Sequence, residues 1–269
     1  MLKLTLKKEL TVPLEVDSLC AGETSLTLDE VANLLVFSGR RQRVLREFFE
    51  VEGVADGDFE LHGDMKKLRW LGKGMRGGHI RVVGDIGFHL GSHMRGGSIR
   101  VEGNAGDWLG AEMLGGHVHV TGNVGGQVGG AYRGSPRGMR NGLISIDGNA
   151  GIEVGRLMRR GTIYVKGEVG DFAGVRMKGG SIVAGRFATH RVGARMLRGT
   201  ILSLTPNDLL QTFTRSGDFE TTYVEVFVRY LEQAGVCIDA FPRNWMRWVG
   251  DEVLGGQGEI WTPAVHEAA

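Results

Sequence analysis

The sequence predicts an all-β fold: a right-handed parallel β-helix of about seven 19-residue coils, with a small α/β cap before it and a helical tail after it. Three observations predict this fold. Methionine recurs with a fixed period, glycine stands at constant offsets from it, and a β-branched residue follows in every copy. Together they indicate short strands that stack in register and are joined by sharp corners.

Methionine marks the period. Its copies lie 19 residues apart, with one interval of 26, at Met75, Met94, Met113, Met139, Met158, Met177 and Met196. A glycine precedes the methionine by three residues in six copies, at Gly72, Gly91, Gly110, Gly155, Gly174 and Gly193. Another glycine follows it by three residues, at Gly78, Gly97, Gly116, Gly142, Gly161, Gly180 and Gly199. Two residues further stands a β-branched residue, at Ile80, Ile99, Val118, Ile144, Ile163, Ile182 and Ile201.

The long interval contains a seven-residue insertion around Ala131–Gly138. In this copy the glycine that elsewhere precedes methionine by three residues is Gly129, which lies before the insertion. We therefore expect one coil of the stack to carry an extra loop.

A period of 19 residues excludes several other repeat architectures. Helical repeats need about 33 to 47 residues and propeller blades about 40 or more. No copy contains ten consecutive residues without glycine, which argues against a helix inside the repeat. Segments such as His117–Val120 alternate as strands do, so the Ile/Val and Met columns are expected to fill the interior.

One polar column is expected to join the coils to each other. It follows a glycine and reads Asp85, Asn104, Asn123, Asn149 and Glu168. Stacked amides at a turn can hydrogen-bond along the stack, so we interpret this column as structural.

The two ends are expected to cap the open sheet edges of the stack. This divides the chain into an N-terminal cap (residues 1–62), the β-helix (63–204) and a C-terminal helix and tail (205–269). The last boundary follows Leu204, where Thr205–Asp208 breaks the pattern.

Local signals predict the elements of the N-terminal cap. Leu2–Leu6 alternates like a strand, and Thr27 with Glu30 forms a capping box at the start of a helix. Phe48–Val51 and Phe59–Leu61 are typical of strands and lead into the first coil.

The C-terminal part contains one further helix signal. Thr222–Ala234 is predicted to be helical, with one apolar face formed by Val224, Phe227, Val228 and Leu231. The tail Trp245–Trp261 is rich in aromatic residues that look exposed, which suits docking to another surface.

Composition limits the functional classes. The formal net charge is +1, which gives no reason to propose nucleic acid or an anionic membrane as a partner. No apolar run approaches the roughly 18 residues that span a bilayer, and Met1–Lys8 lacks the features of a signal peptide. Cys20 and Cys237 form neither a disulfide framework nor a metal pattern. A cytoplasmic protein with buried or idle thiols is therefore predicted.

Residues that could carry chemistry are few. His89 and His93 are four residues apart, a spacing that places two side chains on one face of a helix but not in this repeat. His117 and His119 alternate onto one face but lack a third metal ligand. Gly125–Gly130 looks like a phosphate loop but lacks the Lys-Ser/Thr and the helix that would follow one. We expect no catalytic, cofactor-binding or metal site in this chain.

The residue after each methionine forms the one column with a predicted contact role. It is Leu114 or Leu197 in two copies and a cation in the other five: Arg76, Arg95, Arg140, Arg159 and Lys178. Cations stacked about 5 Å apart repel one another unless something anionic lies along them. Two interpretations stay open, a solvated corner whose side chains splay apart and a ridge that docks an acidic surface of a partner.

Several stretches carry a family resemblance, namely Gly84–Gly91, Gly103–Met113, Gly122–Gly125, Gly130–Gly134 and Arg137–Met139. They resemble the C subunit of formylmethanofuran dehydrogenases and of the related formyltransferase/hydrolase complexes. The core is also similar to the C-terminal GXGXG β-helix domain of glutamate synthase. The resemblance is strong over about residues 50–204 and weaker at both ends, and a free-standing chain of this length favours the one-carbon family.

The resemblance implies a non-catalytic scaffold subunit of an enzyme complex. The related complexes move a formyl group from tetrahydromethanopterin to a methanofuran-type carrier and hydrolyse it to formate, whereas the dehydrogenases reduce carbon dioxide and fix it on methanofuran. The implied partners are an amidohydrolase-like A subunit, a B subunit and a formyltransferase D subunit, and the metals and iron–sulfur clusters belong to these other subunits. The polyglutamate tail expected of such carriers is then a second candidate ligand for the cationic column.

Alternatives stay open. One is the C subunit of a molybdenum or tungsten formylmethanofuran dehydrogenase, although arginine outnumbers lysine 24 to 8, which favours a mesophilic methylotroph. Another is a glutamate synthase-type domain protein. A third is an autonomous acyltransferase, but its hexapeptide coils of about 18 residues do not match this period.

Overall fold

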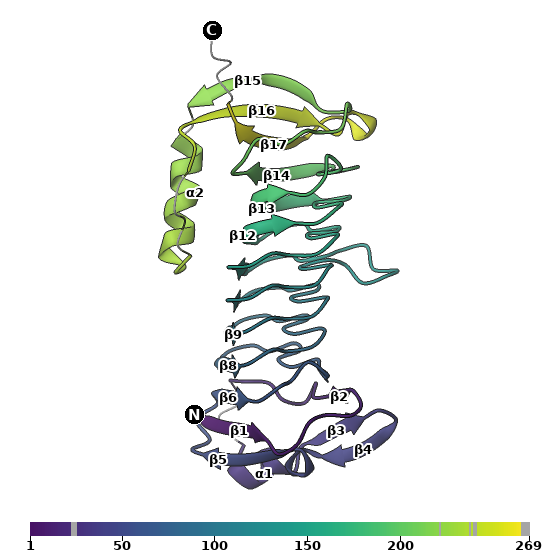
Figure 1. Cartoon of the computed structure of the whole chain (residues 1–269), viewed down its shortest axis with the longest axis vertical. Coiled ribbons are helices and arrows are strands. Elements are labelled where there is room, and N and C mark those ends of the chain that lie inside the picture. The colour runs from purple at the N-terminus through teal and green to yellow at the C-terminus, as the bar shows by residue number, and fades with distance from the viewer. Residues whose placement is uncertain (23–25, 221, 237, 239–240, 265–269) are drawn as a thin grey trace.

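The structure is a computed structural model that describes residues 1–22, 26–220, 222–236, 238 and 241–264. Strands dominate, in one sheet of 13 strands and another of four. The elements lie along one long axis, with β1 (Leu2–Leu6) near one end and β16 (Asn244–Gly250) near the other (Figure 1). The predicted all-β class is confirmed.

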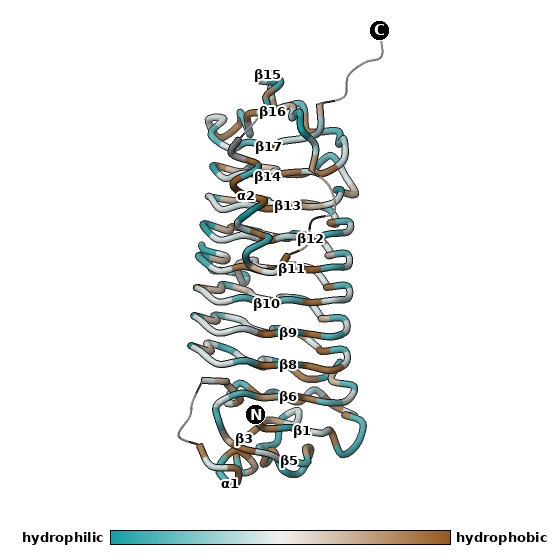
Figure 2. The backbone as a smooth tube through the Cα atoms, turned by 90° about the vertical axis from the view of Figure 1, so that its left-hand side faces the viewer, coloured by the Kyte–Doolittle hydropathy of each residue, from teal (hydrophilic) through white to brown (hydrophobic). Residues whose placement is uncertain are grey.

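Nine strands of the large sheet pair in parallel, in sequence order, and stack along the axis (Figure 2). They are β6 (Phe59–His62), β8 (His79–Val83), β9 (Ser98–Glu102), β10 (His117–Val120), β11 (Leu143–Ile146), β12 (Thr162–Val169), β13 (Lys178–Phe187), β14 (Arg198–Ser203) and β17 (Gly258–Pro263). We call each 19-residue unit a repeat. Equivalent residues of successive repeats are direct partners, as Ile99, Val118 and Ile144 are. A second column of parallel bridges runs beside the sheet through Met65, Ile86, Ala105, Val124, Ala150 and Val169.

The constant spacing of glycine and methionine has a packing reason. Met113 is fully buried. A Cβ on Gly142, in the next repeat, would lie 2.9 Å from the terminal methyl of Met113. That Cβ would also lie 2.7 Å from the carbonyl oxygen of Gly116, and Gly142 has a φ of +101°. The glycine before Met113 is equally restricted, because a Cβ on Gly110 would lie 2.5 Å from Cδ1 of Ile144. Glycine, methionine and isoleucine of neighbouring repeats therefore interlock.

The polar column bonds the repeats together as predicted. The side-chain oxygens of Asp85, Asn104, Asn123 and Asn149 each accept a hydrogen bond from the backbone N–H of the next member of the column. The distances are 2.7–2.8 Å, and the last donor is Glu168. Each side chain thus satisfies a corner N–H that the strands do not pair.

The N-terminal residues close one end of the stack. β1 pairs in parallel with β6 and antiparallel with β5 (Phe49–Gly53), so the last strand runs against the direction of the stack. The predicted capping box is present, because Thr27 and Glu30 exchange hydrogen bonds at the start of α1 (Leu28–Ala32). The rest of the cap comprises β2 (Leu14–Glu15), β3 (Leu35–Ser38), β4 (Arg41–Val44) and η1 (Leu45–Glu47), and β7 (Leu68–Arg69) follows the cap in the chain. β4, β3, β2 and β7 form the smaller sheet in that order.

The C-terminal residues close the other end. β16 pairs antiparallel with both β17 and β15 (Thr214–Glu220), and η2 (Glu252–Leu254) lies between β16 and β17. The outermost strand, β15, is exposed, carries Arg215, Asp218 and Glu220, and shifts its register near Gly217. Charges and an irregular register on an edge strand discourage pairing with another chain.

The predicted C-terminal helix is confirmed as α2 (Thr222–Gln233), which runs alongside the stacked strands (Figure 1). It covers the half of the sheet whose outward positions are apolar. These positions, Leu143, Tyr164, Val183 and Leu202, form a second core with Val224 and Leu231 of the helix. Outward positions of β8, β9 and β10 are instead mostly polar, which explains why α2 lies over the C-terminal strands.

The expectation of exposed aromatic residues in the tail Trp245–Trp261 is wrong. Trp245 is 1% exposed and Trp261 is 7% exposed. Both lie on strands of the large sheet, on the face that α2 covers, and they belong to the second core. Their size suited this core rather than a docking surface.

One of the two cysteines, Cys20, lies within the described residues. Cys20 is half-buried and its Sγ donates to the carbonyl oxygen of Lys73 at 3.1 Å. Cys237 lies outside the described residues. No helix in the described part of the chain has both the length and the apolar character needed to cross a membrane.

Two glycines with similar backbone angles test the interlock. We expect Gly134→Ala, at φ +88° with nothing within 4 Å of the new Cβ, to cost only the strain of about 1–2 kcal/mol. Gly142→Ala should lose roughly a further 1–3 kcal/mol, because its Cβ meets Met113 and the backbone of Gly116. Urea unfolding of both variants measures the difference. Equal losses would show that the methionine column does not restrict this glycine.

Candidate functional site

The five cations predicted as a ridge do stack in register. Arg95, Arg140, Arg159 and Lys178 each donate their backbone N–H to the carbonyl of the methionine in the preceding repeat, at 2.7–2.9 Å. Arg76, Arg95 and Arg159 are exposed, whereas Arg140 and Lys178 are half-buried. We call these five residues the cationic ridge.

The cationic ridge lacks the carboxylate partners that several other arginines of the stack have. Within the residues that the structure describes, none of its five members forms an ion pair. The buried Nε of Arg140 also finds no hydrogen-bond partner there. By contrast, Arg186 pairs with Glu168 and Arg191 pairs with Asp171. Uncompensated stacked cations favour an anionic neighbour.

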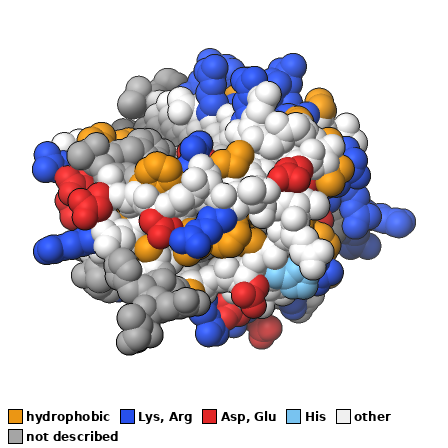
Figure 3. All heavy atoms as spheres, turned by 90° about the horizontal axis from the view of Figure 1, so that it is seen from above, with side chains coloured by type: hydrophobic (Ala, Val, Ile, Leu, Met, Phe, Trp, Pro, Cys, Tyr) orange, Lys and Arg blue, Asp and Glu red, His pale blue; other side chains and the backbone are white. Residues whose placement is uncertain are grey.

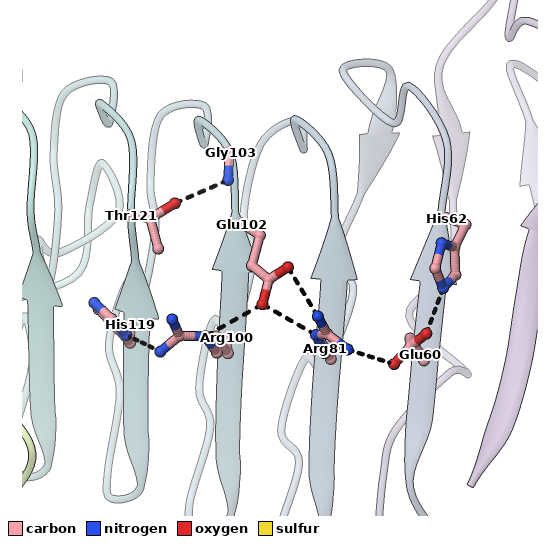
Figure 4. A network of polar contacts seen from close by, with 8 residues as sticks. All are labelled: Glu60, His62, Arg81, Arg100, Glu102, Gly103, His119 and Thr121. Carbon is pink, nitrogen blue, oxygen red and sulfur yellow. Dashed lines mark hydrogen bonds and ion pairs between the residues drawn. The ribbon is translucent and has the colours of Figure 1, made fainter.

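The outward face of the N-terminal strands shows the contrasting arrangement (Figure 4). Arg81 donates to Glu60 at 3.0 Å and to both oxygens of Glu102 at 3.0–3.1 Å. Arg100 lies 3.5 Å from Glu102 and hydrogen-bonds Nδ1 of His119 at 2.8 Å. Every charge in this network has an opposite or polar partner across the strands, so we interpret it as cross-strand stabilisation.

Beside the cationic ridge lies a cluster of aromatic rings that the sequence did not reveal as a unit. Trp70 and His89 stack at 4.0 Å between ring centroids, with an interplanar angle of 8°. Trp108 continues the column at 6.5 Å from His89. Tyr132, from the insertion loop (residues 131–138), packs against all three rings at 5.0–6.0 Å. We call these four residues the aromatic clasp.

Polar contacts fix Tyr132 in the aromatic clasp. Its hydroxyl shares a 3.0 Å hydrogen bond with Nδ1 of His89, and its backbone N–H donates to Oε1 of Glu112 at 3.1 Å. Glu112 also lies 3.8 Å from Nδ1 of His93, whose ring packs against Tyr132. The insertion loop is therefore attached to three earlier repeats.

Burial keeps the clasp uncharged. It lowers the pKa of His89 to about 4, and the positive charge of Arg69 contributes to the shift. Burial also raises the pKa of the Tyr132 hydroxyl, so this group stays protonated. The pKa of His93 is lowered by burial as well, although Glu112 opposes this effect.

A regular sequence signal could have found the column of rings. Trp70, His89 and Trp108 are 19 residues apart and occupy the same position of successive repeats. All three have left-handed backbone angles, with φ of 64–67°. Gln127 and Phe172 have the same left-handed conformation in later repeats. The backbone conformation is therefore a general feature of the repeat, whereas the column of neighbouring rings is specific to the aromatic clasp.

The histidines show one departure from expectation. His89 and His93 do share a side of the molecule, because both rings border Tyr132. The corner at Gly91, with φ +63°, turns the chain between them, so helical spacing is not needed. His117 and His119 hydrogen-bond Ser145 and Asp147, respectively. Among the described residues, no three His, Cys, Asp or Glu side chains converge as metal ligands.

The glycine-rich stretch Gly125–Gly130 is a corner of the stack. Its N–H groups at Gly125, Gly126, Gln127, Gly129 and Gly130 all donate to acceptors within the protein. A phosphate loop needs such groups to point at a ligand. The structural interpretation of these glycines agrees with the observed bonds.

Comparison with known proteins confirms the predicted resemblance. No protein-family model matches the sequence. A segment of 87 residues is 42% identical to the C subunit of the molybdenum-containing formylmethanofuran dehydrogenase 1 of Methanothermobacter thermautotrophicus and to that of Methanothermobacter marburgensis. The segment spans 31% of this chain and 22% of each of those relatives.

A solved structure matches over nearly the whole chain. It is a chain of the X-ray crystal structure of the formyltransferase/hydrolase complex (FhcABCD) from Methylorubrum extorquens in complex with methylofuran. The TM-score is 0.88 with 29% identity, and the match covers 98% of this chain and 100% of that chain.

His89 is expected to make stability depend on pH. Its pKa is about 4 when folded, against about 6.5 when unfolded, so only the unfolded chain takes up a proton between these values. The free energy of unfolding should therefore fall as the pH falls through this window. In urea unfolding, His89→Phe should lose less stability than the wild type over the same range. Tyr132→Phe should retain the wild-type dependence, because burial is the main cause, and equal slopes for wild type and His89→Phe would refute the assignment.

Proposed function

We propose that this chain is a non-catalytic structural subunit of a formyl-transferring and hydrolysing complex of tetrahydromethanopterin- and methanofuran-dependent one-carbon metabolism. One observation carries the proposal: the match to a chain of the FhcABCD complex extends over 98% of this chain and all of the other. A fold preserved from cap to cap supports a shared place in an assembly more strongly than a shared core would.

The architecture that suits this role is a right-handed parallel β-helix of about seven 19-residue coils over residues 63–204, with caps at residues 1–62 and 205–269. Parallel pairing in sequence order supports it, as does the second column of parallel bridges. Crossovers between parallel strands of one sheet are right-handed in about 98% of cases. A rod of this kind presents fixed columns of side chains to its neighbours.

The C subunit of a molybdenum or tungsten formylmethanofuran dehydrogenase is the second candidate. The identity of 42% to such proteins supports it, but that match spans 22% of their length. The two candidates share a scaffold role and differ in whether the partner subunits carry redox chemistry. In either case we place the methanofuran-type carrier, tetrahydromethanopterin and all metals with the other subunits.

Within the proposed complex, the cationic ridge contacts an acidic surface of a partner or the polyglutamate tail of the carrier. Its register, the exposure of Arg76, Arg95 and Arg159, and its lack of ion pairs in the described chain support this role. The ridge is the part of the scaffold that would select and orient a partner, since complementary charge governs encounter and register more than area does.

Affinity purification from the native host tests the proposed function. The tagged chain should recover a formyltransferase subunit and amidohydrolase-like subunits, identified by mass spectrometry, without a molybdenum or tungsten protein. Recovery of molybdopterin and iron–sulfur subunits would support the dehydrogenase instead. A chain that is recovered alone would refute the scaffold role.

Charge reversal tests the cationic ridge. We expect Arg140→Glu with Arg159→Glu to reduce the partner recovered at low salt by about fivefold or more, because attraction becomes repulsion. Added salt should reduce the partner recovered with the wild type more than the partner recovered with the variant, since salt screens the attraction between the ridge and the acidic partner. Arg40→Glu with Arg41→Glu, which makes the same charge change on exposed residues of the N-terminal cap, is the matched control. Unchanged assembly of the ridge variant would leave the ridge as a solvated corner.

A further inference from the structure

The insertion loop is the one departure from the 19-residue spacing of methionine between Met75 and Met196, and it projects from the side of the stack (Figure 1). Both of its ends are hydrogen-bonded to the following repeat. The N–H of Ala131 donates to the carbonyl of Arg156 at 3.1 Å, and that of Gly138 donates to the carbonyl of Leu157 at 2.9 Å. The chain therefore leaves and re-enters the stack at fixed points.

Further contacts hold the loop between these ends. Tyr132 is seated in the aromatic clasp, and Ser135 donates its N–H to the carbonyl of Tyr132 at 3.0 Å, which closes a turn. Lys178 of the cationic ridge donates from Nζ to the carbonyl oxygen of Pro136 at 3.2 Å. The loop is thus ordered by the protein itself, so a partner that binds it would not have to order it.

The tip of the loop carries charge without compensation. Arg133 and Arg137 are exposed, and neither forms an ion pair with any residue that the structure describes. The sequence from Tyr132 to Ile146 contains no Asp or Glu. In the view from above, Lys and Arg side chains gather at the upper edge and at the right-hand edge, and the loop projects to the right in Figure 1 (Figure 3).

We infer that the insertion loop is a pre-organised docking finger that enters a carboxylate-lined recess on a partner protein of the complex, with Arg133 and Arg137 as the recognising groups. Planar guanidinium groups bind carboxylates through paired hydrogen bonds, which gives geometric specificity. A single-stranded nucleic acid would need exposed rings on which to stack, but the rings of the clasp face one another. The inference rests on the proposed function, because it requires a partner in an assembly.

Two pairs of variants test the docking finger in the tagged full-length chain purified with its complex. Arg133→Glu with Arg137→Glu should reduce recovery of the formyltransferase or hydrolase subunits by about tenfold or more, while Arg40→Glu with Arg41→Glu should stay within about twofold of wild type. Tyr132→Ala, which removes the Tyr132 ring from the aromatic clasp, should reduce recovery of these subunits, whereas Tyr132→Phe, which retains the ring, should not. Circular dichroism and thermal unfolding of each isolated variant establish that it is folded.

The outcomes separate the inference from the proposed function. If the wild-type chain recovers none of the expected subunits, the proposed function fails and the docking finger fails with it. If the wild type recovers them and the folded loop variant recovers them equally, the docking finger alone is refuted. Equal recovery by Tyr132→Ala and wild type would refute the pre-organisation by the clasp. The assignment to a protein partner would be overturned if nuclease-sensitive nucleic acid co-purified with the wild-type chain and not with the Arg133→Glu, Arg137→Glu variant.

Discussion

The fold depends on one constraint: each repeat must lie directly on the same residues of its neighbours. Backbone N–H groups reach the carbonyls of the preceding repeat at strand and corner alike, as at Arg140 and Met113. A side chain at a corner therefore lies against the residue at the same position of the neighbouring repeat, and only certain residue types can be stacked in this way. Gly142 is glycine because its φ is +101° and a Cβ would lie 2.7 Å from the carbonyl oxygen of Gly116 and 2.9 Å from the terminal methyl of Met113. Asn123 is an amide because the N–H of Asn149 needs an acceptor.

The same constraint governs the surface of the molecule. A position that is apolar in successive repeats becomes an apolar stripe, which the outward residues of β11–β14 form and α2 covers. Opposite charges at directly opposed or diagonal positions form a paired network, in which Arg81 contacts the directly opposed Glu60 and the diagonal Glu102. A position that is cationic in most repeats becomes a line of like charges, and no charge within the line can neutralise it. The packed interior and the stripes on the surface are thus two consequences of one stacking rule.

The proposed function fits a molecule of this kind. Contacts between successive repeats make the stack extend in one dimension, and a rod can hold several subunits at set positions. The insertion loop breaks the period without breaking the stack, because its ends bond to the next repeat and Tyr132 fills a slot formed by earlier ones. A departure from the repeat that the protein has ordered so fully is a stronger indication of a contact role than the repeated columns themselves.

The sequence by itself determined the strand period, the interior Met and Ile columns, the hydrogen-bonded Asn column, the capping box at Thr27 and the stacking of the five cations. These features are local or recur with the period, so their neighbours can be read from the spacing. Only the tertiary structure decided where non-periodic parts lie. Trp245 and Trp261 looked exposed until their strands joined the large sheet beneath α2. Tyr132 meets Trp70 across more than sixty residues because the insertion loop folds back over three repeats, and no spacing rule describes a segment that occurs once.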